Sequence, residues 1–240
     1  RISEICAVSD GVMAARGDLG VELPFEVVPA AQHKIARTAL TQGVISICAT
    51  EMLESMTTST RPTRAEVADV TGAVRDGFDA VMLSGETAVG IDPPHAVEVM
   101  SRICEAAEKE VVLPNLFADT NPMQAGVTAS ASALAKRMSA DVLLSLTFTG
   151  HSALLLAACR PTAPIVAITP SEVVARQMRL VWGLYPVVVE RASDLDEAIA
   201  SALTAARKQQ LIGPGNTVVI CASRSNPRSN ADTIWLHTER

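Results

Sequence analysis

Apolar runs of strand length alternate with longer amphipathic segments, and this alternation constrains the fold more than any other feature. In the first half, strands are predicted at residues 11–15, 44–49 and 79–83, and helices at 30–42, 64–77 and 94–112. Thr63 and Glu66 fit a capping box that begins the second of these helices. Strands separated by helices pair in parallel through right-handed crossovers, which predicts an α/β fold.

The second half repeats the alternation after a segment rich in proline and asparagine at residues 112–122, which predicts a domain boundary. Its strands are predicted at 142–146, 165–168, 186–189, 217–221 and 233–237, and its helices at 123–138, 152–159, 172–181 and 195–210. Because 240 residues suffice for two modest domains, we expect one domain over residues 1–115 and another over 116–240.

Composition narrows the ligands that this chain can bind. Its 26 acidic and 20 basic residues give a net charge of −6, and only 3% of the residues are aromatic, so no nucleic-acid partner is expected. A phosphate ligand would need a metal ion or a local group of backbone amides. No apolar run approaches the ~18 residues of a membrane-spanning helix, and no secretory signal is visible. Five widely spaced cysteines without a C-x-x-C pair predict buried, reduced thiols in a cytoplasmic protein.

Polar residues follow each of the first three predicted strands. The three clusters contain Gly17, Thr50 and Ser84, which are 33 and 34 residues apart, so one strand–helix unit separates each pair. We therefore expect all three at the carboxyl edge of one parallel sheet, where α/β proteins bind ligands. Polar residues end most strands, which explains any single cluster but explains less well three that combine a carboxylate, hydroxyls and glycines.

The residue types in these clusters suggest specific chemistry. The backbone amides of Gly17 and Asp18 can approach an anion, because glycine has no Cβ. The Asp18 carboxylate suits a hard divalent cation, and the hydroxyls of Thr50 and Ser84 can form hydrogen bonds or relay a proton. Three strand–helix units do not close an eight-stranded barrel, so we expect further units before Arg1.

Four motifs, in this order, closely resemble the pyruvate kinase family. They are DGVMAARGDLGVELP at residues 10–24, CATEMLESM at 48–56, RPTRAE at 61–66 with Asp69-Val70 after it, and DAVMLSGETA at 79–88. The resemblance covers essentially the whole chain, more loosely after Val111. It implies the last strands and helices of a (β/α)8 TIM barrel, followed by the smaller α/β sandwich domain that is regulatory in this family.

The resemblance also implies an activity and a set of site residues. Members of the family transfer phosphate from phosphoenolpyruvate to ADP in glycolysis, giving pyruvate and ATP, with Mg²⁺ (or Mn²⁺) and K⁺ as cofactors. By resemblance, Asp18 is a metal ligand, and the amides of Gly17 and Asp18 bind the substrate carboxylate. Thr50 contacts the substrate within the proton-donating network, which Ser84 supports, and Arg16 orients the Gly17–Asp18 loop.

The sequence departs from the family pattern at several places. It contains no Lys-Ile-Glu-Asn motif, which carries a catalytic lysine and a second metal carboxylate and belongs about one strand before Arg1. The K⁺ site also belongs to upstream sequence. Glu51 stands where the family usually has glutamine, and Val44-Ile45 where Lys-Pro is common. We therefore expect a fragment of the enzyme that is inactive alone; the alternative is a non-catalytic effector-binding module derived from the same family.

The loop after the predicted strand at 142–146 is a second candidate site. It places hydroxyls and amides at a helix N-terminus, where phosphate can bind; the residues are Thr147, Thr149, Gly150 and Ser152. In the family, the corresponding loop holds the phosphate of a sugar-phosphate effector, often with arginine where this chain has His151. Helix capping by serine or threonine explains the same residues, and both interpretations stay open. The family also implies an allosteric homotetramer, with residues 61–66 at an interface.

Overall fold

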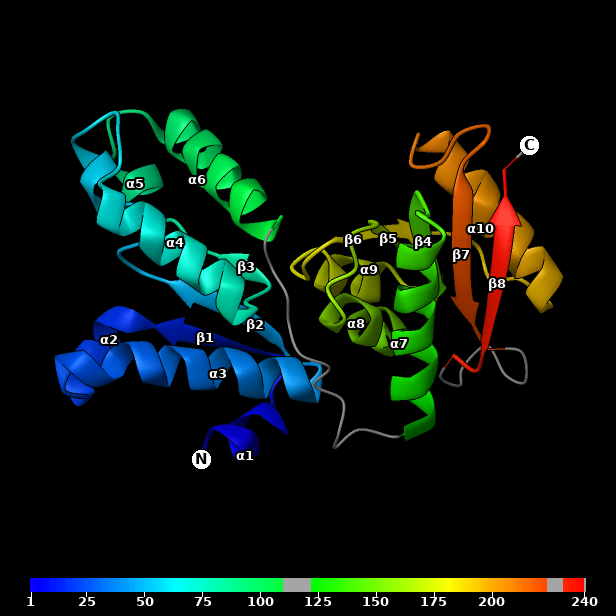
Figure 1. Cartoon of the computed structure of the whole chain (residues 1–240), viewed down its shortest axis with the longest axis horizontal. Coiled ribbons are helices and arrows are strands. Elements are labelled where there is room, and N and C mark those ends of the chain that lie inside the picture. Colours follow the sequence, from blue (N-terminus) through cyan, green and yellow to red (C-terminus); the bar gives the residue numbers. More distant parts are fainter. Residues whose placement is uncertain (110–121, 224–230, 240) are drawn as a thin grey trace. The chain divides into compact units, whose positions relative to one another are not determined.

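The computed structural model describes residues 1–109, 122–223 and 231–239. The chain divides into two units, residues 1–114 and residues 115–240 (Figure 1). The predicted domain boundary between residues 115 and 116 lies outside the described residues. Within the described residues, no helix is both long enough and apolar enough to cross a membrane.

Helices and strands alternate in the first unit as predicted, and the three strands pair in parallel in the order β1-β2-β3. The elements are α1 (Ile2–Cys6), β1 (Gly11–Ala15), α2 (Arg16–Glu22), η1 (Phe25–Val27), α3 (Val28–Gln42), β2 (Ile45–Ala49), η2 (Glu54–Thr57), α4 (Arg64–Asp76), β3 (Ala80–Val81), α5 (Gly85–Ala88) and α6 (Pro93–Glu108).

Local sequence signals set the ends of the long helices. The predicted capping box begins α4: Thr63 Oγ1 accepts a hydrogen bond from the Glu66 amide at 3.2 Å, and Glu66 Oε2 accepts one from the Thr63 amide at 2.7 Å. Gly43 and Gly77 follow α3 and α4 with φ values of 66° and 97°, a left-handed conformation that suits glycine at a helix C-terminus. Each helix therefore turns back sharply into the next strand.

The core of the first unit lies between the strands and the helices that follow them. Ala14 of β1 and Cys48 of β2 are fully buried with Met52 and Val70 in this cluster. Met13, the residue before Ala14 in β1, lies outside this core and is 46% exposed. One face of β1 is thus only partly covered by the described residues.

The second unit carries a five-stranded sheet in the order β6-β5-β4-β7-β8, in which only β8 is antiparallel. The elements are α7 (Pro122–Arg137), β4 (Val142–Leu146), α8 (His151–Ala158), β5 (Ile165–Thr169), α9 (Glu172–Met178), β6 (Leu184–Val188), α10 (Leu195–Lys208), β7 (Thr217–Ala222) and β8 (Thr233–Thr238). Helix α10 packs on one face of the sheet, and α7 and α8 lie on the other (Figure 1). Every residue of β5 is buried as a result.

Candidate active site

The polar clusters after the first three strands lie at one edge of the sheet, because β1, β2 and β3 are parallel. The first cluster is helical: residues 16–20 follow β1 directly and form the beginning of α2. The amide of Gly17 donates a hydrogen bond to Thr50 Oγ1 at 3.0 Å. This bond brings the first two clusters into direct contact at the carboxyl ends of β1 and β2.

Thr50 and Glu51 adopt an unusual backbone at this edge. Their φ values are 71° and 52°, a left-handed conformation that residues with a Cβ adopt only when their surroundings hold them there. Arg16 supplies part of that support, because its Nε donates to the Thr50 carbonyl at 3.1 Å and its Nη2 donates to the same oxygen. The Arg16 guanidinium also pairs with Asp69 of α4 and is nearly buried.

The third cluster is joined to the second through a carboxylate. Glu86 Oε2 accepts a hydrogen bond from the Ser84 amide at 2.7 Å, and Glu86 Oε1 accepts one from the Leu53 amide at 2.9 Å. Among the described residues, the Ser84 hydroxyl is buried and has no hydrogen-bond partner. Its oxygen is thus not bonded to Thr50, and the two hydroxyls share an edge without a direct link.

Asp18 lies in the first turn of α2 with its side chain exposed to solvent. A carboxylate at this end of a helix is favoured by the helix dipole. The described residues contain no cluster of three or more histidine, cysteine, aspartate or glutamate side chains that could enclose a metal. Mg²⁺ does not require such a cage, since it is usually held by one or two carboxylates together with water and substrate phosphates. The exposed carboxylate of Asp18 is therefore suited to be one ligand of such an ion.

Cys48 lies two residues before Thr50 and is fully buried. Burial raises the pKa of the Cys48 thiol to about 11, although Arg16 acts in the opposite direction. Cys159 and Cys221 of the second unit have pKa values raised to about 12, also mainly by burial. All five cysteines lie within the described residues, and none forms a disulfide. These thiols stay protonated near neutral pH and belong to the packing of the protein.

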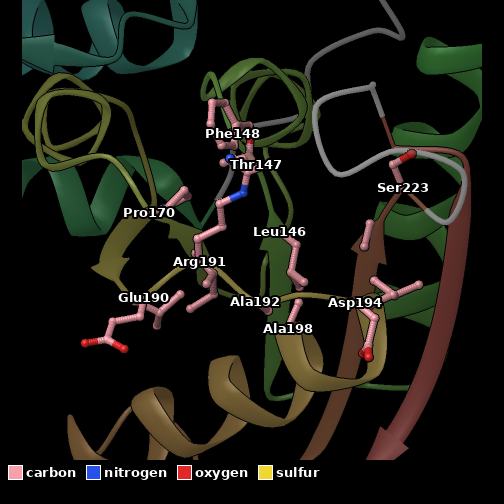
Figure 2. Close-up of a pocket in the computed structure, with 14 residues that line it drawn as sticks. Leu146, Thr147, Phe148, Pro170, Glu190, Arg191, Ala192, Asp194, Ala198 and Ser223 are labelled. Atoms are coloured by element: carbon pink, nitrogen blue, oxygen red, sulfur yellow. The ribbon is translucent and has the colours of Figure 1, made fainter.

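A pocket opens at the carboxyl edge of the second sheet (Figure 2). Its floor is formed by the ends of β4, β5 and β7 and by the start of α10. The chain leaves β4 toward β5 on one side, whereas β7 pairs on its other side, and ligands bind at such a change of direction in open α/β sheets. Figure 2 shows Arg191 extending toward Phe148 and Thr147, and its guanidinium carbon lies 5.8 Å from the centre of the Phe148 ring.

The predicted phosphate loop lies beside this pocket, and its hydroxyls bond to nearby amides. Thr147 Oγ1 accepts from the Gly150 amide at 3.0 Å, and Thr149 Oγ1 accepts from the His151 amide at 3.5 Å. Ser152 is buried, and its Oγ accepts from the amide of Ala231 at 3.2 Å. The bonds of Thr147 and Thr149 occupy amides at the start of α8, and the bond of Ser152 holds Ala231, two residues before β8.

Models of two domains of one family match almost the whole chain. The model described as pyruvate kinase, barrel domain, matches residues 1–97, and the one described as pyruvate kinase, alpha/beta domain, matches residues 126–237. This chain belongs to the pyruvate kinase family. Its α/β fold, with the last part of the barrel followed by the second domain, is confirmed by these matches.

Individual pyruvate kinases are similar over most of the chain but are much longer than it. The enzyme of Sporosarcina psychrophila is 41% identical over 226 residues, which are 92% of this chain and 39% of the relative. Pyruvate kinase 2 of Synechocystis is 44% identical over 214 residues, or 89% of this chain and 36% of the relative. The crystal structure of a pyruvate kinase from Cryptosporidium parvum superimposes with a TM-score of 0.86 at 34% identity, over 98% of this chain and 48% of that one. The chain thus spans less than half of these relatives.

The spacing of the family motifs predicts that they share one sheet edge, but it does not predict the contacts among their side chains. Asp69 and Glu86 both stand inside the motifs that carry the resemblance, yet spacing alone does not show which carboxylate turns inward. Arg191 of the pocket was missed as well. The only available signal was a basic residue shortly after a predicted strand, at the edge where ligands bind.

Proposed function

We propose that these residues form the carboxyl-terminal part of a pyruvate kinase. The enzyme would transfer the phosphoryl group of phosphoenolpyruvate to ADP, forming ATP and an enolate that takes up a proton to become pyruvate. The observation that supports this most directly is the hydrogen bond from the Gly17 amide to Thr50 Oγ1 at 3.0 Å, because it joins two of the family motifs beside Asp18.

Asp18 would be one of the ligands of Mg²⁺ or Mn²⁺, and K⁺ would bind through residues of the complete enzyme outside this chain. The divalent ion neutralises charge on the phosphoryl group, which is what phosphoryl transfer needs most. It also offsets the net negative charge of the chain, which by itself would repel an anionic substrate.

The amides of Gly17 and Asp18 would hold the substrate carboxylate. Because the Gly17 amide now donates to Thr50 Oγ1, it would have to exchange that oxygen for one from the substrate. The exchange would release the Thr50 hydroxyl to face the enolate carbon within the proton-donating network. Ser84, whose hydroxyl has no partner among the described residues, would complete that network from the next strand.

The second unit would regulate the enzyme by binding a sugar phosphate beside α8. Thr147, Thr149, Gly150 and Ser152 would surround the phosphate. Of these residues, Thr147 also lines the pocket to which Arg191 brings a positive charge. The present bonds of Thr147 and Thr149 equally suit simple helix capping, whereas Ser152 accepts from the Ala231 amide. The complete protein would be a cytoplasmic homotetramer, with residues 61–66 at an interface and no nucleic-acid or membrane partner.

A non-catalytic effector-binding module is the alternative function. It is favoured by the five-stranded sheet of the second unit, which has a pocket of its own at the carboxyl ends of its strands. Sequencing the DNA before the codon for Arg1 separates the two. An open reading frame that carries the Lys-Ile-Glu-Asn motif supports the enzyme, whereas a start codon at that point supports the module.

Substitution of Asp18 tests the assigned reaction in the complete protein. Asp18→Ala removes a metal ligand, so we expect pyruvate formation in a Mg²⁺-dependent coupled assay to fall by at least ~100-fold. Glu22→Ala is the matched control, because Glu22 is an exposed carboxylate at the other end of the same helix. Near-normal turnover of Asp18→Ala at ordinary Mg²⁺ concentrations would remove Asp18 from the site. No pyruvate from the unaltered protein would overturn the proposed function.

A further inference from the structure

Glu86 is a buried carboxylate to which the proposed reaction assigns no role. Its side chain is 0% exposed, and removing a carboxylate from water is costly unless hydrogen bonds compensate for the lost hydration. Each of its oxygens accepts a hydrogen bond from a backbone amide, one from Leu53 at 2.9 Å and the other from Ser84 at 2.7 Å. The compensation therefore comes from two loops that follow two different strands.

These two loops carry the hydroxyls of the candidate site. Ser84 is one of the amide donors itself, and Leu53 follows Thr50 by three residues. The turn that begins at Thr50 has left-handed backbone at two successive residues, and such backbone persists only where its surroundings fix it. Arg16 holds the Thr50 carbonyl at the start of this turn, and Glu86 holds the Leu53 amide at its end.

We propose that Glu86 is a positioning residue that fixes the Thr50 hydroxyl relative to the Ser84 hydroxyl. One carboxylate bonded to both loops keeps the two strand ends in register, although the hydroxyls do not touch. The inference rests on the proposed function, because positioning is measured through turnover. Its effect on rate can be large, since ~1 Å of misplacement can cost about 100-fold.

A purely structural role for Glu86 makes a different prediction, and the chain offers a matched control. Asp79 Oδ2 accepts a hydrogen bond from the Ser46 amide at 3.0 Å. This bond links β2 to the residue before β3 at the opposite, amino end of the strands. If both carboxylates are only structural, Glu86→Gln and Asp79→Asn should lower the thermal midpoint and leave kcat of the folded protein unchanged. If Glu86 positions the hydroxyls, only its substitution should lower kcat.

The experiment compares steady-state pyruvate formation by the complete protein and its variants at saturating Mg²⁺. Glu86→Gln keeps one acceptor oxygen but turns an amide N–H₂ toward the other backbone N–H. We expect its kcat to fall by ~10- to 100-fold and its KM for phosphoenolpyruvate to change by less than about threefold. Glu86→Asp keeps the charge but is too short to reach both amides at once, so its kcat should also fall. Asp79→Asn should retain kcat within about twofold.

Each outcome bears on the inference. Folded Glu86→Gln with unaltered kcat overturns it and leaves the proposed function in place. An equal loss of kcat in Asp79→Asn overturns it too, because the effect would then come from general weakening of the strand pair. Failure of both Glu86 variants to fold would show that the residue is structural. No turnover by the unaltered protein overturns the proposed function together with this inference.

Discussion

The two units differ in how far helices cover the faces of their parallel strands. In the second unit, a five-stranded sheet has helices on both faces, and every residue of β5 is buried. In the first unit, the sheet has three strands, β3 contributes only two residues, and Met13 of β1 is 46% exposed. Parallel sheets are normally covered on both faces. Within the described residues, helices thus cover both faces of the second sheet, whereas β1 of the first sheet stays partly exposed.

This difference has the largest consequence for activity. Because the 240 residues contribute Asp18, Thr50 and Ser84 but contain no Lys-Ile-Glu-Asn motif, we expect no measurable pyruvate formation by the chain alone. The assay requires an expression host without its own pyruvate kinases. The cooperative unfolding expected of the second unit serves to check that folded protein is present in the sample. Clear turnover by the purified chain would show that the catalytic groups have been assigned to the wrong residues.

The next consequence concerns folding. Residues 116–240 should give a single cooperative thermal transition, because helices cover both faces of their sheet. Residues 1–115 should aggregate when expressed alone, because β1 and β3 leave open edges and β1 an exposed face. Circular dichroism and size-exclusion chromatography of the two segments measure the contrast. A monomeric, cooperatively unfolding first segment would contradict it.

The secondary structure followed largely from the sequence, and the exceptions have physical reasons. Strands β1 and β4 have the predicted bounds, because each is a short apolar run between turn signals. Strand β6 begins at Leu184, not at the predicted Pro186, because an edge strand tolerates a proline that donates no hydrogen bond to a neighbour. The predicted strand at 79–83 is reduced to Ala80–Val81, and the Asp79 side chain bonds the Ser46 amide just before it.

The site was less predictable than the fold. Spacing placed Gly17, Thr50 and Ser84 at one sheet edge because parallel strands impose it. Left-handed backbone at Thr50 has no signature in a sequence without glycine there, since distant contacts enforce it. The Arg16 side chain bonds the Thr50 carbonyl 34 residues away, and its expected effect on the Gly17–Asp18 loop stays a prediction. Which partner a long side chain reaches depends on packing, not on spacing.

The smallest expected effect is a difference between the two units in how their stability depends on pH. Burial lowers the pKa of His151 in the second unit below its ordinary value of 6.5, so the folded state favours the neutral imidazole. This contribution to stability is present above about pH 6.5 and is lost as the pH falls through the lowered pKa. In the first unit, burial acts to raise the pKa of Glu66, but hydrogen bonds from Ser55 and Thr63 outweigh it and lower the pKa below 4.5. That carboxylate therefore loses its contribution only at more acidic pH.

Thermal unfolding of residues 116–240 at pH 7.5, 6.5 and 5.5 measures this difference. The midpoint of the unaltered segment should fall more steeply toward pH 5.5 than that of His151→Gln, by roughly 1–3 °C, because glutamine takes up no proton. His237, the other histidine of this unit, is present in both proteins and cancels in the comparison. Parallel midpoint curves would mean that His151 gains a proton without cost to the fold.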